Sequence, residues 1–215
     1  MTHHAGSCRF VILISGRGSN MQAIVDTVSE NQLNAQICAV ISNKKEATGI
    51  EWAQQRGIKT HVVDHKQYPN REAFDDDLAT VIDLYQPDYV LLAGFMRVLT
   101  TKFVTRYAQR LINIHPSLLP LFPGLNTHQQ AIDAGMQCHG CTVHFVSAEL
   151  DSGPIIAQGV VPLHSGDTAD VLAARLLRKE HEVYAEVVKW LAQGRVTLQG
   201  ERAVKVQGIA SRAFI

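Results

Sequence analysis

Short apolar runs alternate with segments of helical spacing through the first half of the chain, and this alternation is the strongest constraint on the fold. The runs are RFVILIS (9–15), AQICAVIS (35–42), THVVD (60–64), PDYVLLAG (87–94) and RLINIH (110–115). A strand that is apolar on both faces is buried on both, which is typical of parallel sheets covered by helices. The pattern therefore predicts an α/β fold with a mainly parallel, twisted sheet flanked by helices.

The segments between the runs carry helix signals. One helix is expected to begin near Ser19 and a second to end at Gly57. Asn70 is a suitable N-cap for a third helix, because apolar residues recur at helical spacing from Phe74 onwards. A short helix is expected from about Thr100.

The pattern changes near Cys138. The segments CTVHFVS and PIIAQGVVPL alternate apolar and polar residues, and the polar turn AELDSGP joins them, which predicts antiparallel strands in the C-terminal part. A long helix is expected from Asp167 to about Gln193.

The domain organisation follows from these patterns. Residues 1–7 are expected to form a flexible extension, residues 8–195 one domain, and residues 196–215 a tail with a hairpin.

Composition excludes several classes of protein. The chain has 215 residues, 46% of them hydrophobic, with 20 basic and 20 acidic residues and a net charge of zero. This balance argues against nucleic-acid partners, whose binding depends on clustered Lys and Arg. No apolar run is long enough for a membrane span, the start lacks a secretory signal, and the four cysteines suit a reduced cytoplasmic protein. We therefore expect small-molecule substrates, no nucleic acid, no membrane, no metal, and a monomer or homodimer.

The glycine-rich loop SGRGSN ends the first apolar run. Gly16 and Gly18 permit a tight turn into a helix, whose backbone N–H groups favour a small anion such as phosphate. Ser19 and Asn20 add side-chain donors. The alternative is an ordinary turn that needs glycine for its backbone angles.

A dinucleotide site is a weaker interpretation of the same loop. Met21 stands where the third glycine of the dinucleotide fingerprint belongs, and the second strand ends in SNKK without the acidic residue that binds an NAD ribose. Lys44 and Lys45 would suit NADP, so this alternative stays open.

The stretch NIHPSLLP follows another apolar run. Asn113 and His115 are two residues apart, so in a strand both face the same side while Ile114 packs inward. Pro116 ends the strand. A carboxamide and an imidazole pointing the same way suit an oxyanion that develops at a carbonyl.

An imidazole donates from both nitrogens only when it is protonated, and a neighbouring carboxylate stabilises that form. Asp151, in the polar turn ELDSGP, is the best candidate. A solvated turn aspartate is the alternative.

Three further residues and one motif have open interpretations. Glu180 falls in the apolar stripe of the long helix, so it either binds substrate or reaches solvent at the edge of the stripe. Arg71 is a ligand contact or a surface charge, and His144 faces the site or belongs to the core. The pair CHGC (138–141) lacks a second pair at zinc spacing and is best interpreted as two incidental thiols.

Seven motifs occur in one order and together resemble the folate-dependent formyltransferases, in particular the glycinamide ribonucleotide (phosphoribosylglycinamide) formyltransferases. They are ISGRGSN, GFMRVL, NIHPSLLP, FPGLNTHQQAI, GCTVHFV, ELDSGPII and EH on the last helix. The resemblance covers roughly residues 8–195 and implies a Rossmann-like formyltransferase fold.

The resemblance implies transfer of the formyl group of 10-formyltetrahydrofolate, a cosubstrate, to the amine of 5-phosphoribosylglycinamide in purine synthesis. Asn113, His115 and Asp151 match the catalytic trio of the family, with His144 as an auxiliary position. The ribonucleotide positions are Gly18, Ser19, Asn20 and Glu180. The folate positions are Arg71, Met96, Arg97, Val98, Leu99, Asn113, Ser147, Ala148, Glu149, Leu150 and Asp151.

Two alternatives remain beside this function. One is a hydrolase that removes the formyl group from 10-formyltetrahydrofolate. The other, from a different class, is an NADP-binding oxidoreductase built on the glycine-rich loop.

Overall fold

The computed structural model describes residues 6–200 and 202–215. The extension expected at residues 1–7 therefore lies outside the described residues except for Gly6 and Ser7. The chain divides into two compact units, one up to Ile112 and one from Asn113 to Ile215. Each unit is described by itself.

The first unit is built on a parallel sheet. Its strands are β1 (Cys8–Ile14), β2 (Ala35–Ser42), β3 (Thr60–Val62) and β4 (Tyr89–Leu92), in the order β4-β1-β2-β3. β1 pairs in parallel with both β2 and β4, and its residues from Phe10 to Ile14 are fully buried. A strand buried on both faces is what its continuous apolar run predicts.

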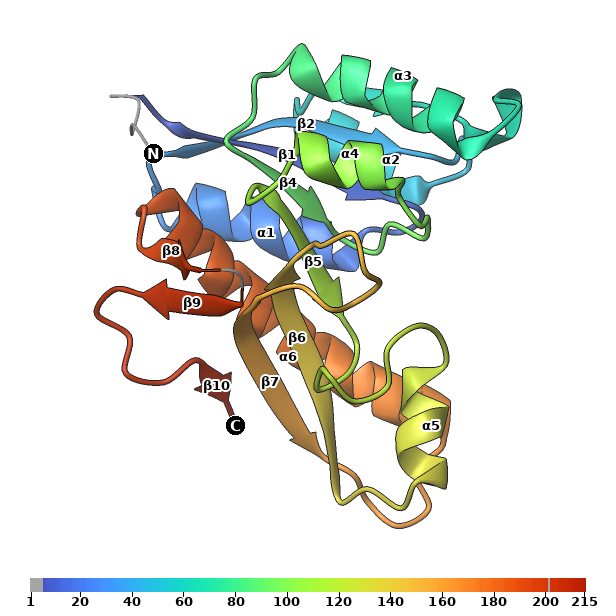
Figure 1. Cartoon of the computed structure of the whole chain (residues 1–215), viewed down its shortest axis with the longest axis vertical. Helices are drawn as coiled ribbons and strands as arrows, with labels where there is room; N and C mark the ends of the chain where they lie inside the picture. Colours follow the sequence, from blue (N-terminus) through green and yellow to red (C-terminus); the bar gives the residue numbers. More distant parts are fainter. Residues whose placement is uncertain (1–5, 201) are drawn as a thin grey trace. The chain divides into compact units, whose positions relative to one another are not determined.

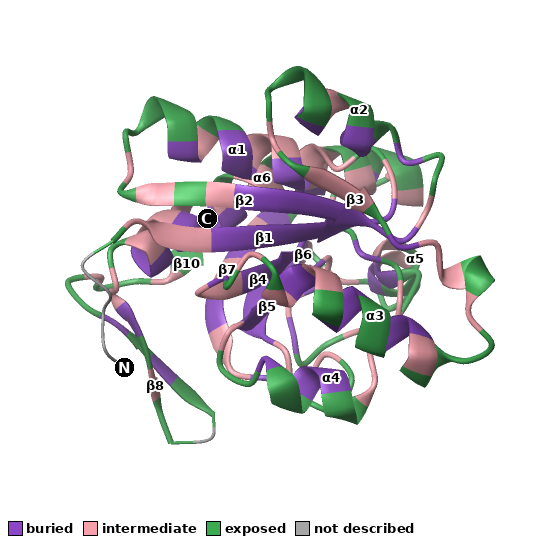
Figure 2. Cartoon of the chain, turned by 90° about the horizontal axis from the view of Figure 1, so that it is seen from above, coloured by how far each residue is buried: buried purple, intermediate pink, exposed green. Residues whose placement is uncertain are grey.

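Helices cover both faces of this sheet. They are α1 (Ser19–Glu30), α2 (Thr48–Gln55), α3 (Arg71–Asp83) and α4 (Thr101–Arg106), with a 3₁₀ turn η1 (His65–Gln67). Figure 2 shows α1 and α2 on one face and α3 and α4 on the other. The predicted N-cap of α3 is confirmed, because the Asn70 side chain accepts a hydrogen bond of 2.8 Å from the Ala73 N–H.

The second unit combines an antiparallel strand pair with a long helix. β6 (Cys138–Phe145) and β7 (Ile155–Pro162) pair antiparallel, and α6 (Ala169–Ala192) runs alongside them (Figure 1). The close approach of α6 requires Gly159, since a Cβ there would lie 2.6 Å from the Lys179 Cγ. The predicted apolar stripe of α6 is fully buried at Leu172 and Leu176.

The remaining elements of the second unit are short. α5 (Thr127–Asp133) precedes β6, and the two-residue strand β10 (Ala213–Phe214) pairs in parallel with β7. In the tail, where a hairpin is expected, β8 (Val196–Gln199) and β9 (Ala203–Val206) pair antiparallel.

β5 (Leu111–His115) crosses the boundary between the units, and its last three residues open the second unit. In that unit the strand order is β10-β7-β6-β5. The parallel sheet of the first unit and the antiparallel pair of the second confirm the predicted fold class. The pair CHGC lies within β6 rather than at the start of a helix.

Candidate active site

His115 and Asp151 form a buried ion pair in the second unit. The His115 Nδ1 lies 3.4 Å from the Asp151 Oδ2, and the two side chains are only 7% and 9% exposed. The other ring nitrogen, Nε2, lies 3.0 Å from the Phe122 carbonyl oxygen. A carbonyl and a carboxylate can only accept hydrogen bonds, so both nitrogens face acceptors and the geometry suits the doubly protonated imidazolium.

The acidic turn, residues 149–154, is tightly constrained. Asp151 has a left-handed backbone (φ 48°), a conformation that Asp tolerates better than most residues. Its Oδ2 also accepts a hydrogen bond of 2.9 Å from the Gly124 N–H. Gly153 is required at its position, because a Cβ there would lie 1.7 Å from the Phe145 carbonyl oxygen. The carboxylate is therefore held at the imidazole rather than in solvent.

Asn113 lies beside a neutral histidine. The His144 Nδ1 lies 2.9 Å from the Phe145 carbonyl oxygen and therefore donates its proton there. The Nε2 of His144 is then an acceptor and takes a hydrogen bond of 3.4 Å from the Asn113 Nδ2. Burial lowers the pKa of His144, which favours this neutral form. His144 thus belongs both to the buried interior and to the site.

The loop after His115 supplies two contacts that side-chain patterns do not reveal. The Phe122 carbonyl and the Gly124 N–H bind His115 and Asp151 through the backbone. Phe122 itself has a positive φ of 53°. The nearest signal in the sequence is the turn-forming stretch FPG, which predicts a bend but no partner.

Two histidines lie next to this loop, the buried His139 and the half-buried His128. His139 lies in β6, and its ring packs edge-on against His128 of α5, with ring centroids 5.2 Å apart. Burial, followed by repulsion from His128, lowers the pKa of His139 to about 4. Burial also lowers the pKa of His128. Neither residue is among the site residues expected from the sequence.

The glycine-rich loop lies in the first unit, between β1 and α1. Gly18 is the N-cap of α1 with a left-handed φ of 68°, and no side chain caps the helix. Ser19 and Asn20 begin the helix, and its first turn holds no acidic residue. Gly49 of α2 packs against the loop, since a Cβ on it would lie 2.9 Å from the Gly16 carbonyl oxygen. An uncapped helix N-terminus of this kind favours anions.

The expected folate residues of the first unit lie on α3 and after β4. Arg71 is the first residue of α3 and is exposed. The segment Met96–Leu99 has no regular secondary structure, and Met96 and Val98 are 63% and 56% exposed. The Arg97 guanidinium carbon lies 5.6 Å from the centre of the Phe74 ring.

The expected folate residues of the second unit precede and include the acidic turn. The Ser147 hydroxyl donates to the Glu149 carbonyl at 2.9 Å, and the Leu150 side chain is 58% exposed. Ala148 is also exposed. A cavity of about 530 Å³ adjoins this turn, with Leu150, Asp151 and Pro120 among its lining residues.

Glu180 is half-buried on α6. Burial and then the Glu180 carboxylate raise the pKa of the Cys141 thiol to about 12. The structure thus brings together Asn113, His115, His144 and Asp151, and it places Gly18, Ser19, Asn20, Arg71 and Met96–Leu99 in the first unit.

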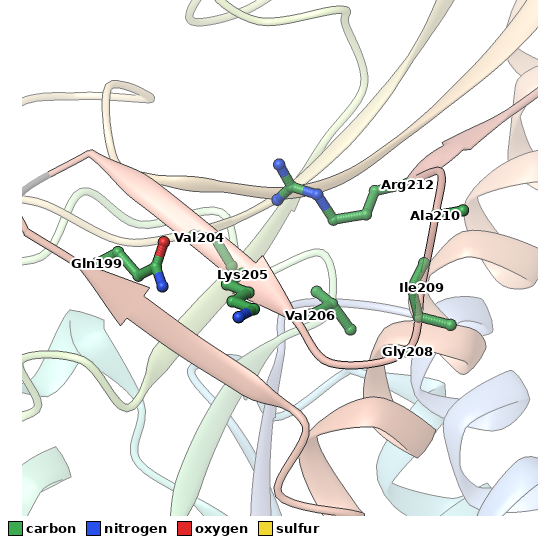
Figure 3. A pocket seen from close by; sticks show the side chains of 8 residues that line it. All are labelled: Gln199, Val204, Lys205, Val206, Gly208, Ile209, Ala210 and Arg212. Carbon is green, nitrogen blue, oxygen red and sulfur yellow. The ribbon is translucent and has the colours of Figure 1, made fainter.

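Another cavity, of about 560 Å³, lies in the tail (Figure 3). Its lining includes Lys205, Gly208 and Arg212, and none of the site residues expected from the sequence. Within residues 6–200 and 202–215, no three His, Cys, Asp or Glu side chains are grouped to hold a metal ion. No helix in that part of the chain is long and apolar enough to cross a bilayer.

Comparisons with known proteins identify the relatives of the chain. The chain is 50% identical over 193 residues to the phosphoribosylglycinamide formyltransferase of Escherichia coli, covering 90% of this chain and 91% of that protein. It is 45% identical to the trifunctional purine biosynthetic protein adenosine-3 of Bos taurus, over 88% of this chain but 19% of that much longer protein.

Solved structures show the same similarity. A phosphoribosylglycinamide formyltransferase from Coxiella burnetii superposes with a TM-score of 0.90 at 42% identity, covering 97% of this chain and all of that one. The formyl transferase family matches residues 8–188. The chain therefore belongs to the formyl transferase family.

Proposed function

We propose that this enzyme transfers the formyl group of 10-formyltetrahydrofolate to the amine of 5-phosphoribosylglycinamide, a step of purine synthesis. Family membership supplies the reaction class, and the names of the relatives supply the acceptor. The observation that carries the proposal is the buried contact between His115 and Asp151, with Asn113 two residues before the histidine on the same strand.

The reaction needs stabilisation of a tetrahedral oxyanion. The amine attacks the formyl carbon, and the carbonyl oxygen gains negative charge. The imidazolium of His115 and the carboxamide of Asn113 donate hydrogen bonds to that oxygen. The Nδ1 of His115 is the available donor, since Nε2 already contacts the Phe122 carbonyl oxygen at 3.0 Å. Loss of one such donor costs about 2.7–4 kcal/mol of barrier in comparable acyl-transfer sites.

Asp151 has two roles in this proposal. Its negative charge stabilises the imidazolium, and it assists transfer of a proton from the attacking amine to the folate nitrogen that leaves, through water. His144 orients Asn113, because the neutral Nε2 accepts one carboxamide N–H. The second N–H is then left for the oxyanion. The amine itself is the nucleophile, so no Ser or Cys nucleophile is needed.

Substrate binding completes the proposal. The uncapped start of α1, with Gly18, Ser19 and Asn20, binds the phosphate of the ribonucleotide, and Glu180 binds its ribose side. Arg71 and the segments Met96–Leu99 and Ser147–Asp151 bind the folate.

We also propose that the enzyme works in the cytoplasm. All four cysteines are free thiols, including the half-buried Cys8 and Cys138, as is usual in a reducing compartment.

The test is an absorbance assay that follows loss of the formyl group from the folate, with and without the amine. Wild-type protein should consume the folate only when phosphoribosylglycinamide is present, and Asp151→Asn should lose at least about a hundredfold in kcat. Asp133→Asn is the matched control, because that exposed carboxylate contacts only Gln129 among the bonds described. Equal consumption without amine would support the hydrolase, and an unchanged Asp151→Asn rate would refute the role of the ion pair.

A further inference from the structure

The segment from Gly94 to Thr100 joins β4 to α4 and contains Met96–Leu99. It has no regular secondary structure, and it exposes the large apolar side chains of Met96 and Val98. Exposed irregular segments are ordinarily mobile. This one is instead held at both ends by buried polar side chains from elsewhere in the first unit.

Ser15 holds the beginning of the segment. Its hydroxyl accepts a hydrogen bond of 2.7 Å from the Met96 N–H and donates one of 2.6 Å to the Asn43 Oδ1. Ser15 is 6% exposed and Asn43 is 1% exposed. The Ser15 N–H also donates to the Gly94 carbonyl at 3.1 Å. Ser15 directly follows β1, so this end of the segment is fixed to the centre of the sheet.

Asp75 holds the end of the segment. Its Oδ2 accepts a hydrogen bond of 2.6 Å from the Thr100 N–H, and the residue is only 2% exposed. Its Oδ1 has no hydrogen-bond partner among the residues that the structure describes. A buried carboxylate with a single hydrogen bond is unfavourable for stability compared with an apolar side chain. Its presence therefore calls for a role beyond packing.

We propose that Asp75 and Ser15 are positioning residues that fix the backbone of Met96–Leu99 in the conformation that receives the folate. This inference rests on the proposed function. A segment ordered before the ligand arrives loses little conformational entropy on binding, so the affinity for folate depends on the two anchors. Neither residue touches the reacting atoms, so the chemical step is independent of them.

The kinetic test compares Asp75→Ala with Ser15→Ala. Each variant should raise the KM for 10-formyltetrahydrofolate about tenfold, which corresponds to about 1.4 kcal/mol. The kcat and the KM for phosphoribosylglycinamide should stay within about twofold. Asp75→Asn keeps an acceptor for the Thr100 N–H and should restore most of the folate affinity. If Asp75→Ala does not fold, Ser15→Ala alone tests the proposal, because it removes only one hydroxyl group and is less disruptive.

Asp76→Ala is the matched control. Asp76 is the next residue of α3, but its exposed carboxylate pairs with Lys102 of α4 at 2.6 Å. Its loss should leave the folate KM unchanged. A rise in both KM values together with a fall in kcat, or the same effect in Asp76→Ala, would overturn the positioning role.

Hydrogen exchange separates this inference from the proposed function. In the wild-type protein the amides of Met96 and Thr100 should exchange slowly despite the irregular structure around them. In Asp75→Ala the Thr100 amide should exchange at least about tenfold faster, and the Met96 amide should keep its protection. Fast exchange at both amides in the wild type would refute the anchoring by Ser15 and Asp75, and this result does not depend on which reaction the enzyme catalyses. Absence of formyl transfer with intact protection refutes the proposed function and, with it, the folate as ligand of the anchored segment.

Discussion

His139 should make the stability of the protein fall as the pH is lowered. The residue is 1% exposed, and burial followed by repulsion from His128 lowers its pKa from 6.5 to about 4. Below about pH 6.5 the unfolded chain therefore binds a proton at this histidine, whereas the folded protein does not bind it until the pH approaches 4. The stabilisation is fully present above pH 6.5, falls as the pH drops towards 4, and then levels off.

The magnitude follows from these two pKa values. Between pH 7 and pH 4.5, a group with a pKa of 6.5 in the unfolded chain and about 4 in the folded protein removes about 2 kcal/mol of stability. This is a large share of the roughly 5–15 kcal/mol that stabilises a typical domain.

The assay is urea unfolding, followed by circular dichroism at pH 7 and pH 4.5. His139→Gln keeps a polar side chain at this position but does not titrate, so it should lose about 2 kcal/mol less than the wild type over this range. His164→Gln, which replaces an exposed imidazole of the same unit, is the control and should behave as the wild type does. Equal losses in the wild type and His139→Gln would refute the buried neutral histidine.

Three further predictions concern the site. Gly153→Ala should destabilise the protein by about 3 kcal/mol or more in urea unfolding, because its Cβ would overlap the Phe145 carbonyl; a change below 1 kcal/mol would contradict this geometry. Inorganic phosphate should inhibit competitively with the ribonucleotide at the start of α1, and indifference to phosphate in initial-rate assays would argue against that site. Titration with the protein should cause no saturable change in NADPH fluorescence, since Met21 replaces the third glycine of the fingerprint. Saturable binding would instead support the NADP-binding oxidoreductase.

Much of the architecture follows from local patterns. The continuous apolar runs predict β1 and β2, and Asn70 predicts the start of α3. β10 was not predicted, because a two-residue strand shows no periodicity and depends on pairing with β7. α5 was not predicted either, because its seven residues THQQAID include too few apolar side chains for a helical pattern.

The site was predictable only in part. The spacing of Asn113 and His115 predicts a shared face, and the polar turn suggests Asp151 as the partner. The contacts from the Phe122 carbonyl and the Gly124 N–H were not predictable, because they are made by backbone groups, which residue types do not distinguish. The role of His144 became clear only from its two hydrogen bonds, which fix its tautomer.

A double-mutant cycle measures whether His115 and Asp151 act as one unit on the oxyanion. Single-turnover formyl transfer would be measured for His115→Ala, Asp151→Asn and the double variant, with folding checked by circular dichroism. The double variant should be no more than about threefold slower than His115→Ala, since residues that act together give strongly non-additive losses. Losses that multiply would show that the two residues act independently, and they would refute the coupled action of His115 and Asp151.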